Sequence, residues 1–263
     1  MDRREFLNGS VGASFAVVAA ATTTNVQAVE PEPNRVAALT ENLNPKIQAA
    51  RQTALKILNP TAKELERGLR LHAESIVFDS YGFSPRSALD GDKLAAEIEA
   101  GASKMEIDDL REEMPMIRCV TNPDEQREYL DAWRASGVTC VFQNAGQEGQ
   151  DPMRLLKRLA RFTYVTDMLR DHVAKAATPD DVEAAKRDGI HCLYMTGNGV
   201  PLTQDWVSIP DELRYLRVFY QLGIRMMHLT YQRRNMIGDG CGEKANAGLS
   251  DFGRSVIAEM NRV

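Results

Sequence analysis

The chain has 263 residues, 43% of them hydrophobic, which is enough to bury a substantial core in one domain. Its formal net charge is −5, and its basic residues are interspersed with acidic ones, so composition gives no signature of nucleic-acid binding. No apolar run approaches the roughly 20 residues that a membrane-spanning helix needs. We therefore expect a globular protein with no nucleic-acid partner and no transmembrane segment.

Residues 1–28 have the layout of a twin-arginine export signal. Arg3 and Arg4 precede an apolar pair, and a mildly apolar segment follows over residues 9–21. Ala28 then ends a plausible small-residue cleavage site. This layout predicts a bacterial protein exported by the twin-arginine route to the periplasm or another extracytoplasmic site. A frayed amphipathic helix is the alternative interpretation.

Residues 29–72 are predicted to form a linker and lead-in helices. The linker, from Val29 to Asn34, alternates glutamate with proline and is expected to be stiff. Asn44 and Pro45 set the cap and first turn of one helix. A threonine and a glutamate at positions 61 and 64 form a capping box for a second helix. We expect these helices to pack on the outside of the main domain.

From residue 73 onward, compact apolar strands alternate with helices. The strands are predicted over residues 75–79, 138–143, 173–177, 190–196 and 224–230. Helices are predicted between them, several of them with an Asx or threonine cap and proline in the first turn. Continuous apolar strands alternating with helices indicate a parallel sheet that is covered on both faces.

Polar and glycine-rich residues gather where these strands end, at 144–149, 197–199 and 232–248. A (β/α)8 barrel and an open doubly wound sheet both place their ligand site at this edge. About five strands are present, and the sequence stops at Val263 within a helix. We predict an α/β fold in which residues 73–263 form a partial TIM barrel, about five of eight βα units, preceded by the N-terminal helices. An open five-stranded sheet is the alternative.

The edges of such a partial barrel would leave backbone N–H and C=O groups unpaired. Apolar strands with open edges tend to pair with other chains. We therefore expect the protein to self-associate, as a homo-oligomer or through aggregation.

Several blocks in the last third of the chain occur together in one order. They are Tyr220–Arg225, Gly238–Cys241, Gly248–Arg254 and Glu259–Arg262. These blocks resemble the membrane dipeptidase (renal dipeptidase) family of zinc metallopeptidases, and the likeness extends back to about His72. The resemblance implies a barrel hydrolase that holds two zinc ions at the carboxyl ends of its strands and hydrolyses dipeptides.

The resemblance also implies where the metal ligands should lie. In the family, a histidine and an aspartate two residues apart end the first strand, and a glutamate at a later strand end bridges the two ions. These positions hold Tyr81, Phe83 and Thr196 in this sequence. Phenylalanine cannot bind zinc, and a neutral hydroxyl is a poor bridge between two dications. The remaining zinc histidines of the family would lie beyond Val263.

The four histidines of the chain are not predicted to replace those ligands. His228 lies three residues before Tyr231, so strict alternation along a strand puts the two on opposite faces. His191 is at the far end of its strand, and His172 is at a helix C-terminus, which suits a cation. His72 lies in the helix before the first strand. We expect all four to serve packing or surface roles, and we expect zinc to bind at less than stoichiometric amounts.

Residues near the last strand could bind a substrate without zinc. Arg233 and Arg234, beside Asn235, offer charge-assisted donors for a carboxylate, although a solvated pair of loop cations is the alternative. Tyr231 stands where the resemblance implies a substrate-contacting histidine.

The substituted positions together would line a more aromatic and less charged pocket than a di-zinc site, which is typical of small-molecule binding. Two functions therefore stay open at this point. One is metal-dependent hydrolysis of dipeptides. The other is a catalytically inactive exported barrel that binds a small peptide-like ligand or a partner protein.

Overall fold

The computed structural model describes residues 34–146, 151–205 and 207–263, and these belong to one compact unit. The predicted export signal, the predicted linker before Asn34, and residues 147–149 of the polar segment after the second strand lie outside the described residues. Within these ranges, no helix combines the length and the apolar character that crossing a membrane requires.

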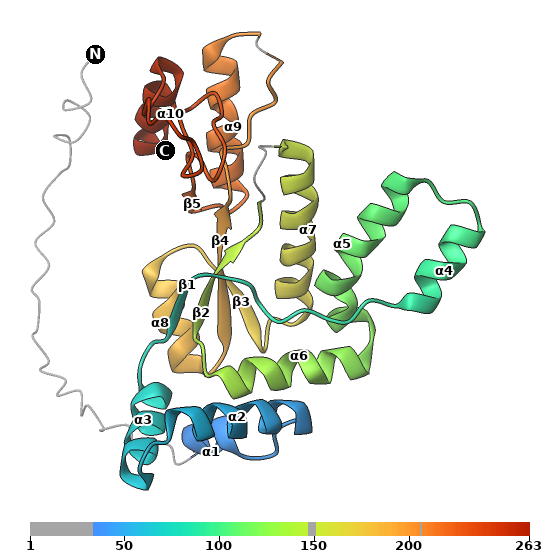
Figure 1. Cartoon of the computed structure of the whole chain (residues 1–263), viewed down its shortest axis with the longest axis vertical. Coiled ribbons are helices and arrows are strands. Elements are labelled where there is room, and N and C mark those ends of the chain that lie inside the picture. The colour runs from blue at the N-terminus through green and yellow to red at the C-terminus, as the bar shows by residue number, and fades with distance from the viewer. Residues whose placement is uncertain (1–33, 147–150, 206) are drawn as a thin grey trace, which may run out of the picture. The chain divides into compact units, whose positions relative to one another are not determined.

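A parallel sheet forms the centre of the described chain (Figure 1). Its strands are β1 (Phe78–Gly82), β2 (Cys140–Asn144), β3 (Val173–Ala176), β4 (His191–Gly197) and β5 (Met226–Met227). The order is β1-β2-β4-β3, with β5 paired to the end of β4. One edge of β4 pairs with β2, and its other edge is shared by β3 along residues 191–194 and by β5 along residues 196–197.

The predicted α/β class with a parallel sheet and lead-in helices is confirmed. The strand order has one feature that the prediction did not include. β4 lies between β2 and β3, whereas successive strands are neighbours in a complete (β/α)8 barrel. Because every strand pair is parallel, the carboxyl ends of β1, β2, β4 and β5 still meet at one edge of the sheet.

Alternation along β4 sends its side chains to two differently covered faces. Leu193 and Met195 pack into the large core formed with α5 (Lys104–Thr121), α6 (Pro123–Ser136) and α7 (Pro152–Met168). Cys192 packs on the other face, in a smaller cluster with Val182 and Ala185 of α8 (Pro179–Asp188). Around β4 the sheet is therefore covered on both faces, as its continuous apolar strands predicted, whereas four of the five residues of β1 are exposed.

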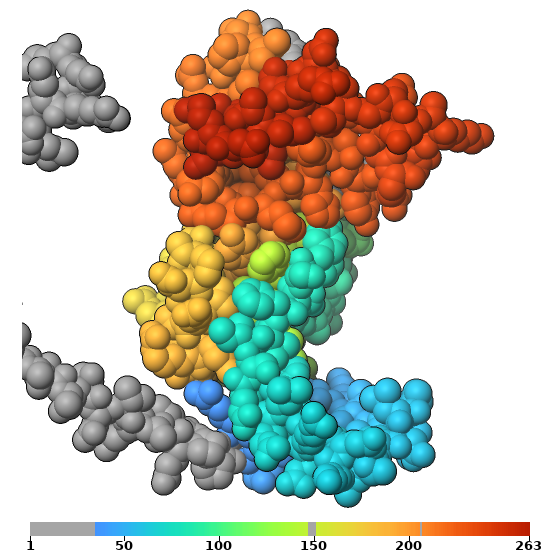
Figure 2. Space-filling view, turned by 90° about the vertical axis from the view of Figure 1, so that its left-hand side faces the viewer, coloured from blue at the N-terminus to red at the C-terminus, as the bar shows by residue number. Residues whose placement is uncertain are grey.

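The remaining helices lie at the two ends of the sheet. α1 (Asn34–Thr40), α2 (Pro45–Leu58) and α3 (Ala62–Glu74) lie near the end where the strands begin (Figure 1). α9 (Ile209–Gln221) and α10 (Asp251–Arg262) pack together near the end where the strands finish. Figure 2 shows the same separation, with the blue helices at one end and the red helix at the other. α4 (Gly91–Glu99) packs against α5.

The predicted helix caps are confirmed, but α1 was not predicted. Asn44 accepts a hydrogen bond from the backbone of the first turn of α2, and Thr61 and Glu64 make the capping box of α3. α1 is only seven residues long, too short to form alone in water. It is held by packing against α3 and α6, contacts that local sequence does not encode.

All five strands differ somewhat from their predicted ranges, and β1 and β5 differ most. β1 begins at Phe78 instead of residue 75, and its pairing with β2 shifts register between Asp79 and Gly82. β5 is limited to Met226 and Met227, although residues 224–230 were predicted. The backbone N–H of His228 makes one further bond to the Gly197 carbonyl, at 3.1 Å, and the chain then turns into the long loop before α10.

Candidate functional site at the strand ends

Pairing in the sheet fixes which residues meet at its carboxyl edge. Gly82 lies opposite Gln143, Asn144 opposite Thr196, and Thr196 opposite Met226. The segments that leave these four strands therefore start side by side. The segments after β2 and β4 approach closely at Gly146, because a Cβ atom there would lie 2.6 Å from the backbone nitrogen of Asn198.

Tyr81 and Asn144 connect the first two strand ends. The side-chain N–H of Asn144 donates to the Tyr81 hydroxyl at 3.1 Å. The amide oxygen of Asn144 is buried and has no hydrogen-bond partner among the described residues. A buried amide oxygen without a donor is costly in free energy, so an N–H group that reached this atom would form a favourable hydrogen bond.

His228 extends this connection to the ends of β4 and β5. Its ring stacks on Tyr81, with centroids 5.1 Å apart, and lies 6.3 Å from the ring of Tyr231. Its Nδ1 atom lies 3.2 Å from the amide oxygen of Asn198. An amide oxygen can only accept, so Nδ1 carries the proton and Nε2 remains as the second polar atom of the ring. We call Tyr81, Asn144, Asn198, His228 and Tyr231 the strand-end cluster.

The prediction that His228 and Tyr231 face opposite ways is wrong. It assumed that a strand continues through residue 230, so that side chains alternate. β5 ends at Met227, and the backbone from His228 onward is not extended strand. Because the alternation stops there, both rings turn to the same side and stack.

Thr196 does not face the strand-end cluster as a ligand would. Its side chain is fully buried, and its hydroxyl donates to the Gln143 carbonyl at 3.2 Å. Gln143 is also fully buried, and its amide oxygen accepts from the backbone N–H of Ser84 at 2.7 Å. The position that the resemblance gave to a bridging carboxylate is thus part of the bonding between strands.

The phenol of Tyr81 stays neutral. Its pKa is raised above the usual value, first because burial disfavours the phenolate and second because Tyr231 lies close by. Phe83 points to a different partner: its ring is 54% exposed, and the guanidinium carbon of Arg86 lies 5.3 Å from its centroid. The two positions of the expected histidine and aspartate therefore supply an un-ionised hydroxyl and a hydrocarbon ring.

The loop after β5 is held together by its own polar side chains. Arg234 pairs with Asp239, and its backbone N–H donates to Glu243 at 2.7 Å. Asn235 donates to the Leu229 carbonyl at 2.9 Å and accepts from two backbone N–H groups of the loop. Gly240 is required for close packing, since a Cβ atom there would lie 2.5 Å from the backbone of Gln232.

These contacts bear on the residues predicted to bind substrate. The structure brings Tyr231 into the strand-end cluster, whereas Arg234 and Asn235 are engaged in folding the loop. A substrate contact by Arg233, Arg234 or Asn235 stays a prediction. Sequence reasoning did not single out Asn144 and Asn198 as site residues, although both lie in the polar strand ends that it marked.

The residues of the strand-end cluster do not fit a zinc site. The cluster offers one imidazole, two phenols and two amides, whereas zinc is held by imidazoles, thiolates and carboxylates. The carboxylate of Asp79 folds back over Gly82 and accepts from the backbone N–H of Tyr81 at 3.2 Å. In the ranges that the structure describes, no three histidine, cysteine, aspartate or glutamate side chains come together as a metal site.

Comparison with known proteins places this geometry in a family. The sequence profile of the membrane dipeptidase family, Peptidase family M19, matches residues 65–263. Dipeptidase tcpJ of Claviceps purpurea is 25% identical over 143 residues, which is 54% of this chain and 29% of that protein. A protein of Schizosaccharomyces pombe named an uncharacterized dipeptidase is 30% identical over 111 residues, 41% of this chain and 24% of that protein. The matched part of the chain thus spans less than a third of either relative.

A solved structure supports the relationship at the level of the fold. The chain is similar to the crystal structure of the probable dipeptidase PvdM from Pseudomonas aeruginosa, with a TM-score of 0.50 and 15% identity. The likeness covers 75% of this chain and 47% of that one. At this identity the likeness indicates a shared fold only. The chemistry of the site depends on its own residues.

Proposed function

The chain belongs to the membrane dipeptidase family, and from this premise we propose that its strand-end cluster binds a small peptide-like ligand without hydrolysing it at a metal centre. Family membership supports the ligand class, since the named relatives are dipeptidases. The composition of the cluster supports the absence of hydrolysis, because its donors suit hydrogen bonding to a neutral amide better than holding a dication.

The observation that carries the proposal is the amide oxygen of Asn144, which lies beside the Tyr81 hydroxyl and has no hydrogen-bond partner in the part of the chain that the structure describes. A peptide N–H or an N-terminal ammonium would supply the missing donor. Nε2 of His228 lies on the same ring that joins Tyr81 to Asn198 and offers a second polar contact. The ring faces of Tyr81 and Tyr231 would pack against the apolar part of a side chain.

Hydrolysis of a dipeptide is the second candidate, and the family relationship favours it. In this family of metallopeptidases the reaction depends on a metal-activated water. We derive no such step for this chain, because the donor set of the strand-end cluster does not fit the metal. The two candidates differ in one measurable property, which is turnover of a bound dipeptide.

Calorimetric titration of the full chain with a panel of dipeptides tests the binding. The variant Tyr81→Phe removes only the hydroxyl next to Asn144 and should weaken dipeptide binding about fivefold, the equivalent of one neutral hydrogen bond. Tyr164→Phe is the matched control, because Tyr164 is an exposed tyrosine on α7. Equal affinities in the two variants would exclude the strand-end cluster as the binding site. Release of free amino acids by the wild type would instead favour hydrolysis.

We also propose that the protein acts outside the cytoplasm, on the strength of the twin-arginine pattern at Arg3 and Arg4. N-terminal sequencing of the protein from its native cells should find Val29 as the first residue. An intact Met1 on protein from the cytoplasmic fraction would contradict export.

A further inference from the structure

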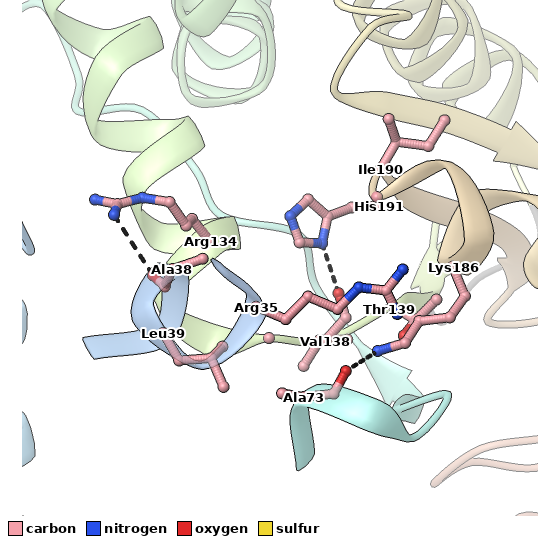
Figure 3. Close-up of a pocket in the computed structure, with 12 residues that line it drawn as sticks. Arg35, Ala38, Leu39, Ala73, Arg134, Val138, Thr139, Lys186, Ile190 and His191 are labelled. Carbon is pink, nitrogen blue, oxygen red and sulfur yellow. Dashed lines mark hydrogen bonds between the residues drawn. The ribbon is translucent and has the colours of Figure 1, made fainter. Parts of the chain in front are cut away.

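A cavity lies at the end of the sheet where the strands begin, opposite the strand-end cluster. It has a volume of about 150 Å³, is open to solvent, and is lined by residues of α1, the end of α3, α6, the segment before β2, α8 and the start of β4 (Figure 3). The residues that line it include four nitrogen-bearing side chains, those of Arg35, Arg134, Lys186 and His191. Among the described lining residues there is no aspartate or glutamate.

Two of these side chains, Arg35 and Lys186, retain N–H donors that face the cavity. Lys186 donates one N–H to the Ala73 carbonyl at 2.7 Å, which leaves two of its three hydrogens. Figure 3 shows Arg35 and Lys186 pointing toward one another near Thr139. The structure gives Arg35 no hydrogen bond or ion pair to another described residue. Arg134 differs, because its guanidinium donates hydrogen bonds to the carbonyls of Glu41 and Asn42 and pairs with Asp131.

Thr139 adds a neutral donor to the same wall. Its hydroxyl oxygen accepts from the backbone N–H of Val77 at 3.1 Å, and its side chain is 4% exposed. A hydroxyl that accepts one bond still has its own hydrogen to donate. A guanidinium, an ammonium and a hydroxyl thus approach one small space from three different elements.

The like charges in this cavity repel one another. The pKa of Lys186 is lowered, first because burial disfavours its charge and second because Arg35 lies close by. The pKa of His191 is lowered mainly by burial, and the nearby charges of His172 and Lys186 act in the same direction. An anion in the cavity would offset both effects, since no carboxylate among its described walls does so.

We propose that this cavity binds a small oxyanion, held by Arg35, Lys186 and Thr139. Several donors arriving from different directions suit a group with several oxygens, such as phosphate or sulfate, better than a spherical ion. The size agrees, because one water occupies about 30 Å³ and a phosphate is as large as a few waters. The bound anion would tie α1 and α8 together, far from the strand-end cluster and independently of its ligand.

Calorimetric titration of the full chain with inorganic phosphate tests this site, in chloride buffer of constant ionic strength. We expect one phosphate to bind per chain. Arg35→Gln should weaken it at least about tenfold, the equivalent of one charge-assisted hydrogen bond, and Arg35→Lys should recover part of the loss. Arg67→Gln is the matched control, because Arg67 lies exposed on α3 and outside the cavity. Its affinity should equal that of the wild type.

Three results would overturn the proposal. The first is no phosphate binding by folded wild type at millimolar concentration. The second is equal affinity in Arg35→Gln and Arg67→Gln, with both variants shown to be folded by circular dichroism. The third is a thermal stabilisation by phosphate that chloride reproduces at the same ionic strength, which would indicate general screening instead of a site.

Discussion

The two ends of the sheet carry opposite kinds of polar chemistry. Where the strands finish, neutral groups are joined to one another: Asn144 to Tyr81 at 3.1 Å, and His228 to Asn198 at 3.2 Å. Where the strands begin, Arg35 and Lys186 face a cavity with no carboxylate among its described walls. Parallel α/β proteins usually place their reactive groups at the carboxyl ends of the strands. In this chain the strand-end cluster is neutral, and the cationic cavity lies at the other end.

This contrast separates the fold of the family from its chemistry. The sheet and its covering helices depend on buried apolar residues such as Leu193, Met195 and Trp133, and these residues place no demand on the strand ends. Side chains beyond the strands can therefore change from charged to neutral without loss of the fold. Dipeptidase ancestry and metal-dependent activity are separate properties of such a chain, and each needs its own test.

The largest expected effect is on stability at the end where the strands begin. Trp133 is 1% exposed and stacks on His191 with ring centroids 4.8 Å apart. Trp133→Ala should lower the free energy of unfolding by about 3–5 kcal/mol. Tyr81→Ala, at the other end, should lower it by only about 1–2 kcal/mol, because Tyr81 is 38% exposed. Urea denaturation of both variants measures the difference.

A control separates packing from hydrogen bonding at Trp133. Its indole N–H is buried and makes no hydrogen bond to another described residue, so Trp133→Phe keeps a ring against His191 and removes this donor. We expect Trp133→Phe to be clearly more stable than Trp133→Ala. If Tyr81→Ala were as damaging as Trp133→Ala, the strand-end cluster would be a structural core and not a site.

A smaller effect should follow from removing the hydroxyl of Thr196. Thr196→Val keeps the shape of the side chain but loses the bond to the Gln143 carbonyl, which should cost about 0.5–1.5 kcal/mol. Because this hydroxyl is fully buried between strands, the variant should bind dipeptides as the wild type does. Calorimetry and urea denaturation give the two readings. A large loss of dipeptide affinity with little loss of stability would place Thr196 in the site.

The smallest effect should appear as a pH dependence of stability. His191 has a folded-state pKa below the unfolded value of about 6.5, mainly because it is buried, with His172 and Lys186 adding repulsion. The unfolded chain then binds more protons between the two pKa values, so stability is complete above about pH 6.5 and falls as the pH drops through the folded pKa. His191→Gln should lose less stability between pH 7.5 and 5.5 than the wild type. An equal or larger loss in the variant would show that His191 does not contribute.

The sequence predicted the helix caps well because they depend on a few neighbouring residues. Asn44 caps α2, and Thr61 and Glu64 form the capping box of α3, at the residues expected. The parallel sheet and the polar carboxyl edge were predictable for a similar reason, since apolar runs and glycine-rich strand ends are both local patterns. The location of the candidate site, at the carboxyl edge of the sheet, could therefore be predicted even though its individual residues could not.

The members of the site were harder to predict because they depend on where each strand stops. The sequence pattern places the His228 side chain on the opposite face from Tyr231, which is wrong. The end of β5 is set by its pairing with Thr196 and Gly197 of β4, and these residues are distant in the sequence. Asn144 and Asn198 look like ordinary strand-end amides until the sheet brings their neighbours beside them. The placement of β4 between β2 and β3 is likewise a tertiary feature. Self-association of the chain stays a prediction.

Zinc content measured together with dipeptide turnover tests the central claim most directly. Elemental analysis of the unmodified full chain, purified without chelators, should find well under one zinc ion per chain. The same protein should bind dipeptides. When zinc, cobalt or manganese is added, it should hydrolyse them no faster than they hydrolyse in the absence of the protein. About two zinc ions per chain with turnover of a bound dipeptide would contradict the claim that the strand-end cluster is a binding site without a metal centre.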